Sequence, residues 1–555
     1  MASALESRFD EEQEFSVQER IALAALEGHD ADIPSNEGYV LSTTQDLKRL
    51  QSAASRRSHG QTAKGDEEKQ MVQPAAVKGL DGQPVHLVGW DGEDDPKNPM
   101  NWSTSVKVMN IFLIAALAFI IPLASSMFAP GVPQLMAEFG STSQTLSAFV
   151  VSAYVLGFAI GPLLLAPLSE LYGRLIVYHI TNVLFVVFTV ACAVSSDLSM
   201  LIVFRFLAGC MGATPLTNGG GTIADMIAQS NRGLAMSCFS LGPLIGPVVG
   251  PLCGGFLSEA KGWRWVFWVI TMVSGLLTIL CLFFMRESYA PYLLKRKVAR
   301  LRKETGNMEL RSKLDIGLSP KDLFWISIAR PIKMLIFSPI VFTLSLYMGI
   351  SYAYMYILFT TFTLVFEGQY GFSDSLVGLA YLGLGIGNVI GLSLFSYFSD
   401  KTVASKAIII TKEDGTTMAY TKPEARLPPM TIGAILLPIG FFIYGWTAQY
   451  QVQYIVPIFG TLLIGGANIC IFMITMTYLV DAYTVYAASA LAANTVLRSV
   501  MAALLPLCGQ KMYSALGLGW GNSLLAFVAM AMMPLPYLFS RYGEHLRNKF
   551  SMEGL

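Results

Sequence analysis

Residues 242–255 read Gly-Pro-Leu-Ile-Gly-Pro-Val-Val-Gly-Pro-Leu-Cys-Gly-Gly, and this stretch decides the class of fold. Glycine recurs here every fourth residue, so the glycines fall along one stripe of a helix. In water such a helix would be poor, because interior Gly and Pro cost roughly 1 and 3 kcal/mol per residue. Within a bilayer the backbone has no water to bond, so helix remains favoured, and the stripe lets a second helix approach closely. The residues of the stripe and its prolines are Gly242, Pro243, Gly246, Pro247, Gly250, Pro251 and Gly254.

Apolar runs of membrane-spanning length recur along the rest of the chain. Of its 555 residues 53% are apolar, and from about residue 108 onward short polar stretches separate the runs. About 20 residues cross the hydrocarbon core as a helix. We therefore predict an all-α membrane protein. Its twelve spans are predicted at 108–128, 145–166, 175–194, 200–222, 234–258, 264–285, 338–362, 374–398, 429–447, 453–479, 484–507 and 519–540.

The net charge of zero hides two opposite parts. Residues 1–106 carry 10 Lys and Arg against 19 Asp and Glu, whereas the remainder carries 28 against 19. If the amino terminus lies inside, the inner segments of the membrane part hold 23 basic residues and the outer ones 3, which follows the positive-inside rule. We therefore expect both termini in the cytoplasm. The acidic tail at 1–106 is poor in aromatic residues, and we expect most of it to be disordered.

A polar segment at 286–337 divides the spans six and six. We expect an N-terminal bundle at 107–285, a cytoplasmic central loop at 286–337, a C-terminal bundle at 338–540 and a cytoplasmic tail at 541–555. Residues 292–305 alternate apolar and basic side chains at helical spacing, which predicts an amphipathic helix on the anionic inner leaflet; a solvated linker is the alternative. Two six-helix halves are a known transporter plan, with the substrate site near the bilayer midplane.

Ionisable side chains inside predicted spans are costly, and they therefore indicate functional positions. Arg205 lies about one turn into the fourth span, where a coupling role and snorkelling to the outer interface fit its position equally well. Arg498 lies near the middle of the eleventh span, where pairing with carbonyls is the structural alternative. Glu170 and Arg174 lie at the turn between the second and third spans, and Asp225 lies at the inner end of the fourth.

Polar and aromatic side chains at mid-span are candidate substrate contacts. Tyr352 and Tyr356 share a face of the seventh span, and an aromatic cleft suits flat, lipophilic or cationic ligands. Packing in the core is the alternative for each tyrosine. The other candidates are the mid-span amides Asn218, Asn388 and Asn468.

The sequence lacks the motifs of enzymes and ATP-driven pumps. It contains no Gly-x-x-x-x-Gly-Lys-Ser/Thr phosphate loop and no His-Glu-x-x-His zinc motif. Its seven cysteines lie within or at the ends of apolar runs, as small buried residues do, and only five histidines are present. We expect no enzyme activity, no cofactor, no metal and no nucleic-acid partner.

Four motifs give the chain a resemblance to the Major Facilitator Superfamily, and within it to the twelve-span drug:proton antiporters of fungi. The Gly-Pro stretch resembles the antiporter motif of the fifth span. Residues 167–174, Pro-Leu-Ser-Glu-Leu-Tyr-Gly-Arg, are similar to the signature of the loop between spans two and three. Arg205 with two later glycines resembles the fourth-span motif, and residues 286–291, Arg-Glu-Ser-Tyr-Ala-Pro, look like the fungal exit from span six. The resemblance covers residues from about 88 to 545.

The resemblance implies two six-helix bundles around a central cleft, and proton-coupled export of lipophilic or cationic small molecules such as drugs or toxins. It implies that Arg205 takes part in proton coupling and that Glu170 and Arg174 latch the cytoplasmic gate. Asp225 and Glu170 are the nominated proton carriers. The chain has Glu170 where the superfamily often has Asp, and Leu171 where it often has a base. We expect a monomer in the plasma membrane, with the vacuolar membrane as the alternative.

Three other functions stay open on the sequence. A polyamine:proton antiporter would share these motifs. A nutrient uptake carrier would share the fold, although sugar carriers usually continue after span six with Pro-Glu-Ser-Pro-Arg, and here Ala290-Pro291 follow Tyr289. A membrane sensor that does not transport would be expected to carry a long folded cytoplasmic extension.

Overall fold

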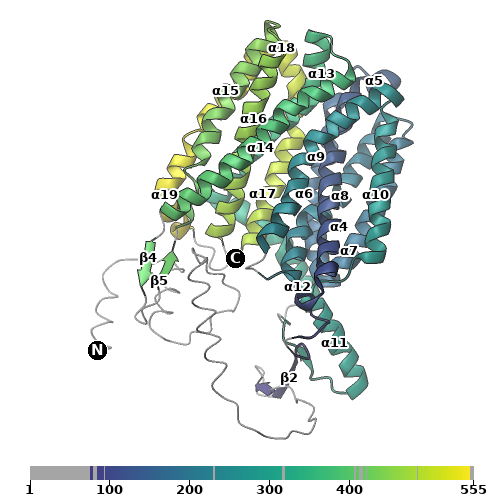
Figure 1. Ribbon diagram of the computed structural model, residues 1–555, viewed down its shortest axis with the longest axis vertical. Coiled ribbons are helices and arrows are strands. Elements are labelled where there is room, and N and C mark those ends of the chain that lie inside the picture. Colours follow the sequence, from purple (N-terminus) through teal and green to yellow (C-terminus); the bar gives the residue numbers. More distant parts are fainter. Residues whose placement is uncertain are drawn as a thin grey trace.

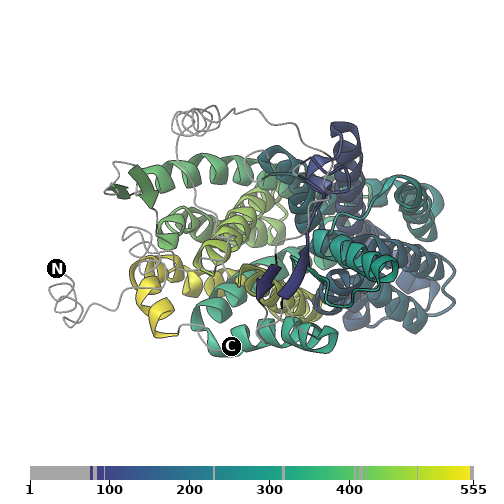
Figure 2. The same cartoon turned by 90° about the horizontal axis from the view of Figure 1, so that it is seen from below.

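The computed structural model describes residues 76–78, 84–92, 94–228, 232–315, 319–405, 408–411, 417–420, 422–483 and 486–550. Most of the predicted tail at 1–106 lies outside this part, so its expected disorder stays a prediction. Long helices stand side by side in two bundles, seen from the side in Figure 1 and from below in Figure 2. We call the end that carries α11, α12 and α19 the lower end, and the end that carries α5 the upper end (Figure 1).

The N-terminal bundle contains the first six membrane helices. They match the predicted spans to within a few residues, because a helix in lipid must be an apolar run that pairs its own backbone. Their bounds are α4 (Thr104–Ser126), α6 (Gln144–Tyr172), α7 (Arg174–Ala193), α8 (Leu198–Met226), α9 (Arg232–Lys261) and α10 (Arg264–Phe284). A 3-10 turn, η2 (Ala129–Gly131), and the short helix α5 (Val132–Glu138) continue α4 at the upper end.

The C-terminal bundle contains the other six crossings. Its helices are α13 (Pro339–Tyr370), α14 (Asp374–Ser405), α15 (Met430–Gln449), α16 (Ile455–Ala482), α17 (Ala487–Leu504) and α18 (Pro506–Met532). By length and hydropathy the described residues hold eleven candidate spans, and the last of these, Ala487–Arg547, contains two crossings. The predicted class, twelve membrane helices in two bundles, is confirmed.

The last two crossings end at other residues than predicted. The predicted spans were 484–507 and 519–540, but α17 continues directly into α18, and the chain reverses only at Gly517. Gly517 has a φ of 75°, a conformation that glycine adopts without a Cβ clash. Across this bend the Tyr513 hydroxyl donates to Asn522 Oδ1 at 2.8 Å. After Met532 a separate lower-end helix, α19 (Leu535–Lys549), begins.

The glycine stripe of α9 packs against α4, a helix of the same bundle. A Cβ at Gly246 would lie 2.8 Å from the Phe119 carbonyl oxygen, and a Cβ at Gly250 would lie 2.6 Å from Ser126 Oγ. Ser126 Oγ also donates to the Pro247 carbonyl at 3.2 Å. That carbonyl lacks its usual helix partner because residue 251 is proline, which has no N–H. The neighbouring helix thus satisfies a carbonyl that the proline leaves free.

A different face of α9 forms the main seam between the bundles. There α9 packs along α14, and a Cβ at Gly378 would lie 2.8 Å from the Pro251 carbonyl oxygen. At the upper end of this seam Glu259 Oε2 accepts a hydrogen bond from the Ser375 backbone N–H at 2.9 Å. Further contacts between the bundles join α6 to α17 and to α18.

The central loop holds more structure than the sequence indicated. A helix covers the predicted amphipathic segment, α11 (Ala290–Thr305), but its buried Val298 packs on Val88 and Leu310. The face expected on the inner leaflet is therefore covered by protein, and α11 slopes away from the bundles (Figure 1). Further elements that we did not predict are α12 (Pro320–Phe337), the three-stranded sheet β1 (Ala76–Lys78), β2 (Pro84–Val88) and β3 (Arg311–Ser312), and the hairpin β4 (Ile408–Thr411) and β5 (Thr417–Tyr420).

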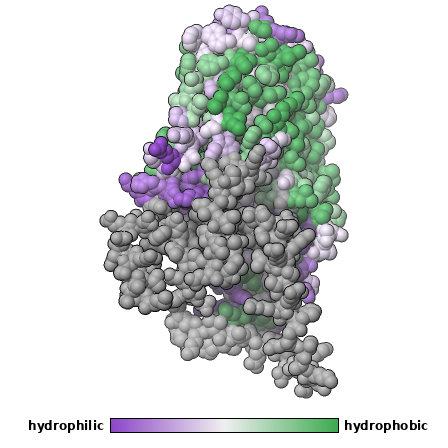
Figure 3. Space-filling model, turned by 60° about the vertical axis from the view of Figure 1, so that its left-hand side comes forward, coloured by the Kyte–Doolittle hydropathy of each residue, from purple (hydrophilic) through white to green (hydrophobic). Residues whose placement is uncertain are grey.

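Apolar side chains cover much of the outer surface of the bundles. Figure 3 shows them gathered over the upper part of the face in view, with polar side chains at the upper rim. Phe283, Leu276 and Ile279 of α10 are among the exposed apolar residues. In water such a surface would aggregate, so it identifies the lipid-facing belt.

Candidate functional site

Arg205 of α8 lies inside the N-terminal bundle with 1% of its surface exposed. Its Nη2 donates to the backbone carbonyls of Ser125 at 3.1 Å and Val151 at 3.4 Å. Ser125 belongs to the last turn of α4, where carbonyls have no partner within the helix. The guanidinium carbon also lies 5.2 Å from the ring centroid of Phe128 and 5.3 Å from that of Tyr154. These inward contacts exclude the snorkelling alternative.

Ser125 also connects this arginine to the C-terminal bundle. Its Oγ lies 3.2 Å from the hydroxyl of Tyr356, on α13. Ser125 Oγ donates its own hydrogen to the Pro122 carbonyl at 2.7 Å, so Tyr356 is the donor in the contact between the bundles. The ring of Tyr352, one turn earlier on α13, lies 5.3 Å from the ring of Tyr356.

Arg498 of α17 lies on the other side of these tyrosines. Its guanidinium carbon is 4.6 Å from the ring centroid of Tyr352 and 5.1 Å from that of Phe472. Its Nε is buried without a hydrogen-bond partner, and within the described ranges the side chain forms no ion pair. The expected alternative, pairing with carbonyls, is therefore not found. We call Arg205, Ser125, Tyr356, Tyr352 and Arg498 the central layer.

The structure brings only some of the predicted substrate contacts together. Asn468 of α16 donates to the Ser351 carbonyl at 2.8 Å, which places it next to Tyr352. Asn218, by contrast, accepts from Ser169 Oγ at 3.2 Å between α8 and α6. Asn388 is buried on α14, against α16. Asn218 therefore lies apart from the central layer, since its amide joins two helices of one bundle. Asn388 forms no hydrogen bond to the central layer within the described residues.

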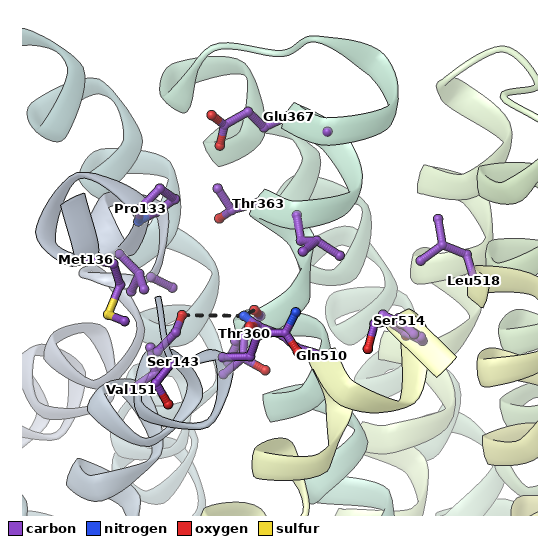
Figure 4. A pocket seen from close by; sticks show the side chains of 18 of the residues that line it. Pro133, Met136, Ser143, Val151, Thr360, Thr363, Glu367, Gln510, Ser514 and Leu518 are labelled. Atoms are coloured by element: carbon purple, nitrogen blue, oxygen red, sulfur yellow. Dashed lines mark hydrogen bonds between the residues drawn. The ribbon is translucent and has the colours of Figure 1, made fainter. Parts of the chain in front are cut away.

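A cavity of about 900 Å³ lies between the bundles at the upper end. Its walls come from α5 and α6 on one side and from α13, α15 and α18 on the other (Figure 4). Near its deep end Gln510 Nε2 donates to the Thr360 carbonyl at 3.2 Å and to Ser147 Oγ at 3.4 Å, so this amide connects the two bundles. Glu367 lies at the other end of the cavity (Figure 4).

The central layer lies directly below this cavity. Val151, whose carbonyl accepts from Arg205, lines the cavity. Phe359 also lines it, and its ring lies 5.2 Å from that of Tyr356. None of the five predicted substrate contacts is itself among the lining residues. The sequence did not identify Gln510, which lies in the segment between the predicted spans 484–507 and 519–540, although an amide so close to the end of an apolar run was a usable signal.

A second cluster lies at the lower end of the N-terminal bundle. Arg174 Nε donates to Asp225 Oδ2 at 2.6 Å, and the side chains are only 11% and 18% exposed. The carboxylate of Glu287 accepts the backbone N–H groups of Arg174 and Leu175, both at 3.1 Å. These N–H groups begin α7, so Glu287 caps the positive end of its dipole. Gly173, with a φ of 90°, makes the turn.

The expected latch of Glu170 and Arg174 stays a prediction, although this cluster gives Arg174 another partner. Arg174 pairs with Asp225 of its own bundle, and Glu170 is exposed and forms no hydrogen bond or ion pair within the described residues. A bond between the bundles through Glu170 and Arg174 is therefore absent. Tyr289 covers the guanidinium of Arg174 at 4.9 Å. Burial, together with the negative charge of Glu170, raises the pKa of Tyr289 to about 12. The positive charge of Arg174 opposes this shift only in part, so the hydroxyl of Tyr289 stays neutral.

The C-terminal bundle repeats this arrangement. Arg426 precedes α15 and pairs with Asp481 near the end of α16, just as Arg174 begins α7 and pairs with Asp225 near the end of α8. Glu424 next to it pairs with Arg547 of α19 at 3.5 Å. The sequence signal for Arg426 was its position directly before an odd-numbered span. Within the ranges that the structure describes, no cluster of His, Cys, Asp and Glu suits a metal ion.

Comparison with known proteins identifies the family. Residues 114–506 match the sequence pattern of the Major Facilitator Superfamily. The chain is 53% identical over 490 residues to the MFS-type transporter tndD of Aspergillus flavipes, which covers 88% of this chain and 90% of that protein. It is 53% identical over 464 residues to the efflux pump radE of Floropilus chiversii, covering 83% and 85%.

Solved structures share the fold. The inward-open xylose transporter XylE from E. coli aligns with a TM-score of 0.57 and 16% identity, over 77% of this chain and 95% of that one. At this identity the likeness concerns the fold alone. The family pattern covers more than half of the chain, and the relatives align over most of their length. The chain belongs to the Major Facilitator Superfamily and is a multi-pass membrane transporter, not an enzyme.

Proposed function

We propose that this transporter exports lipophilic small molecules from the cytosol in exchange for protons. The observation that carries the proposal is the cavity of about 900 Å³ between the bundles, directly above a buried aromatic layer. Drug-sized ligands bind in apolar, aromatic hollows of this size, and a site between two bundles suits alternating access. One relative, radE of Floropilus chiversii, is named an efflux pump, which supports the outward direction.

For proton coupling we propose Arg205 and the lower-end acids. Arg205 holds the last turn of α4 through Ser125, and Ser125 meets Tyr356 of the other bundle. A change at Arg205 would therefore alter the contact between the bundles. Asp225, paired with Arg174, and the exposed Glu170 remain the proposed proton acceptors; protonation of Asp225 would remove the attraction that holds its pair.

The plasma membrane is the proposed location. Both termini are proposed to lie inside, because of the basic residues at the lower end. Polyamine export is a second candidate, since Glu367 lines the cavity and would attract a cation. The central layer favours it less, because this layer contains two arginines and no carboxylate.

The test is efflux of a panel of labelled lipophilic compounds from cells with and without the protein, each with and without a proton uncoupler. We expect lower accumulation with the protein, and an uncoupler should abolish the difference. Arg205→Lys keeps the charge but loses the forked donors, so we expect efflux to fall about tenfold or more. Efflux that ignores the uncoupler, or full activity of Arg205→Lys, would contradict the coupling proposal.

A further inference from the structure

We infer that Arg498 contacts the substrate directly, and that the exported molecules carry an anionic oxygen group, a carboxylate or a phenolate, on an aromatic body. The inference rests on the proposed export function and names the substrate class for its central layer. It departs from the cationic cargo that the sequence left open.

Arg498 is an uncompensated cation among the described residues. Arg174 has the carboxylate of Asp225, and Arg205 has two carbonyl acceptors, whereas Arg498 has neither. Arginine stays charged in proteins, and a buried charge is costly unless it is paired and hydrogen-bonded. A ligand anion would supply the missing partner and thereby gain affinity.

The rings around Arg498 leave its donors free. Tyr352 and Phe472 contact the guanidinium carbon through their ring faces at 4.6 and 5.1 Å. Cation–π contacts of this kind hold the flat group in place but use none of its N–H donors. A planar fork held in this way suits the two oxygens of a carboxylate, or one phenolate oxygen.

Other polar atoms near Arg498 also lack partners. On α17 these are Asn494 Oδ1 and Ser499 Oγ, and on the facing side of α13 it is Ser345 Oγ, one turn before Gly349. The two helices meet at this level, since a Cβ at Gly349 would lie 3.3 Å from the Cα of Arg498. Buried polar groups in proteins are nearly always hydrogen-bonded, so this concentration indicates a site for a polar ligand group.

The position of Arg498 allows a ligand to reach it from the boundary between the two bundles. Arg498 and Tyr352 both keep partial exposure, whereas Tyr356 beyond them is 1% exposed. Tyr356 reaches Ser125 of the N-terminal bundle, and α17 itself packs on α6 of that bundle. Arg498 therefore lies beside the boundary that opens when the bundles rock apart.

The experiment compares two dyes that share a three-ring xanthene body, anionic fluorescein and cationic rhodamine 123. Their affinities are measured by fluorescence anisotropy on the purified full-length protein in lipid nanodiscs. Wild type is expected to bind fluorescein more tightly. Arg498→Gln should weaken fluorescein binding about tenfold or more and change rhodamine 123 binding by less than about twofold. Arg498→Lys should weaken fluorescein binding less than Arg498→Gln does, because lysine keeps the positive charge but lacks the planar forked donors of arginine.

Lys261→Gln is the matched control, because it removes one positive charge from the exposed upper end of α9, and it should change neither affinity. Preference of the wild type for rhodamine 123, no fluorescein binding, or equal weakening of both dyes by Arg498→Gln would overturn the inference. If Arg498→Gln does not fold, Arg498→Lys decides by the same comparison. Failure of the proposed function looks different: fluorescein would still bind through Arg498, but cells would show no uncoupler-sensitive efflux.

Discussion

At the scale of single residues, the ion pair of Arg174 and Asp225 differs from a surface pair. Because both side chains are largely buried and 2.6 Å apart, we expect a coupling energy of about 1.5–3 kcal/mol. A double-mutant cycle with Arg174→Ala and Asp225→Ala, read as unfolding free energy in detergent, measures it. The exposed i,i+4 pair Arg300 and Glu304 is the control and should show no measurable coupling. Equal coupling energies in both pairs would contradict the expectation that burial strengthens the pair of Arg174 and Asp225.

The sequence could mark these residues but not their partners. Arg205 and Arg498 are visible because charges within apolar runs are rare. Their difference is not visible, because it depends on acceptors far along the chain: Arg205 meets carbonyls 80 and 54 residues away, and Arg498 meets none within the described residues. The partner of Arg174 is hidden for the same reason, since Asp225 lies 51 residues from it, and the expected latch of Glu170 and Arg174 stays a prediction.

At the scale of elements, the glycine stripe of α9 is required by the backbone of α4. Gly246→Leu would place a side chain where even a Cβ meets the Phe119 carbonyl at 2.8 Å, so α9 must move away from α4. We expect a loss of about 3 kcal/mol or more in stability, and loss of efflux. Thermal unfolding and transport of the purified variant measure both effects.

Gly275→Leu in α10 is the control, because open space surrounds that glycine. We expect this variant to keep its thermal stability and its efflux. A Gly246→Leu protein as stable and active as Gly275→Leu would show that the close approach to α4 has no structural importance.

Helices were the most predictable elements, because in lipid each must be a continuous apolar run, and such a run is visible in the sequence alone. The turn at Gly517 lies within the predicted connection between the last two spans, but the helical continuation of residues 506–516 was not predicted, because Gln510, Lys511 and Ser514 there are typical of a loop. The partner of the α9 stripe was also hidden, because a stripe of small residues shows that a helix approaches but not which one.

At the scale of the whole molecule, α9 packs against a different helix on each of two faces. One face fixes it to α4 within its bundle, and the other forms the seam with α14. The upper end of the seam is reinforced where Gln134 Nε2 donates to Asp374 Oδ2 at 2.6 Å. The cavity lies beside this seam rather than along it, so rocking of the bundles can open one side while the packed helices act as the hinge.

Orientation in the membrane gives the last prediction. Ser514 lines the cavity at the upper end, and Lys303 is exposed on α11 at the lower end. In a background with the exposed Cys238, Cys253 and Cys508 changed to Ser, a membrane-impermeant maleimide should label Ser514→Cys in intact cells. Lys303→Cys should react only after permeabilisation, since we propose from the positive-inside rule that the basic lower end faces the cytosol. The opposite pattern would show that the cavity faces the cytosol and that the lower end lies outside, which would contradict the proposed orientation.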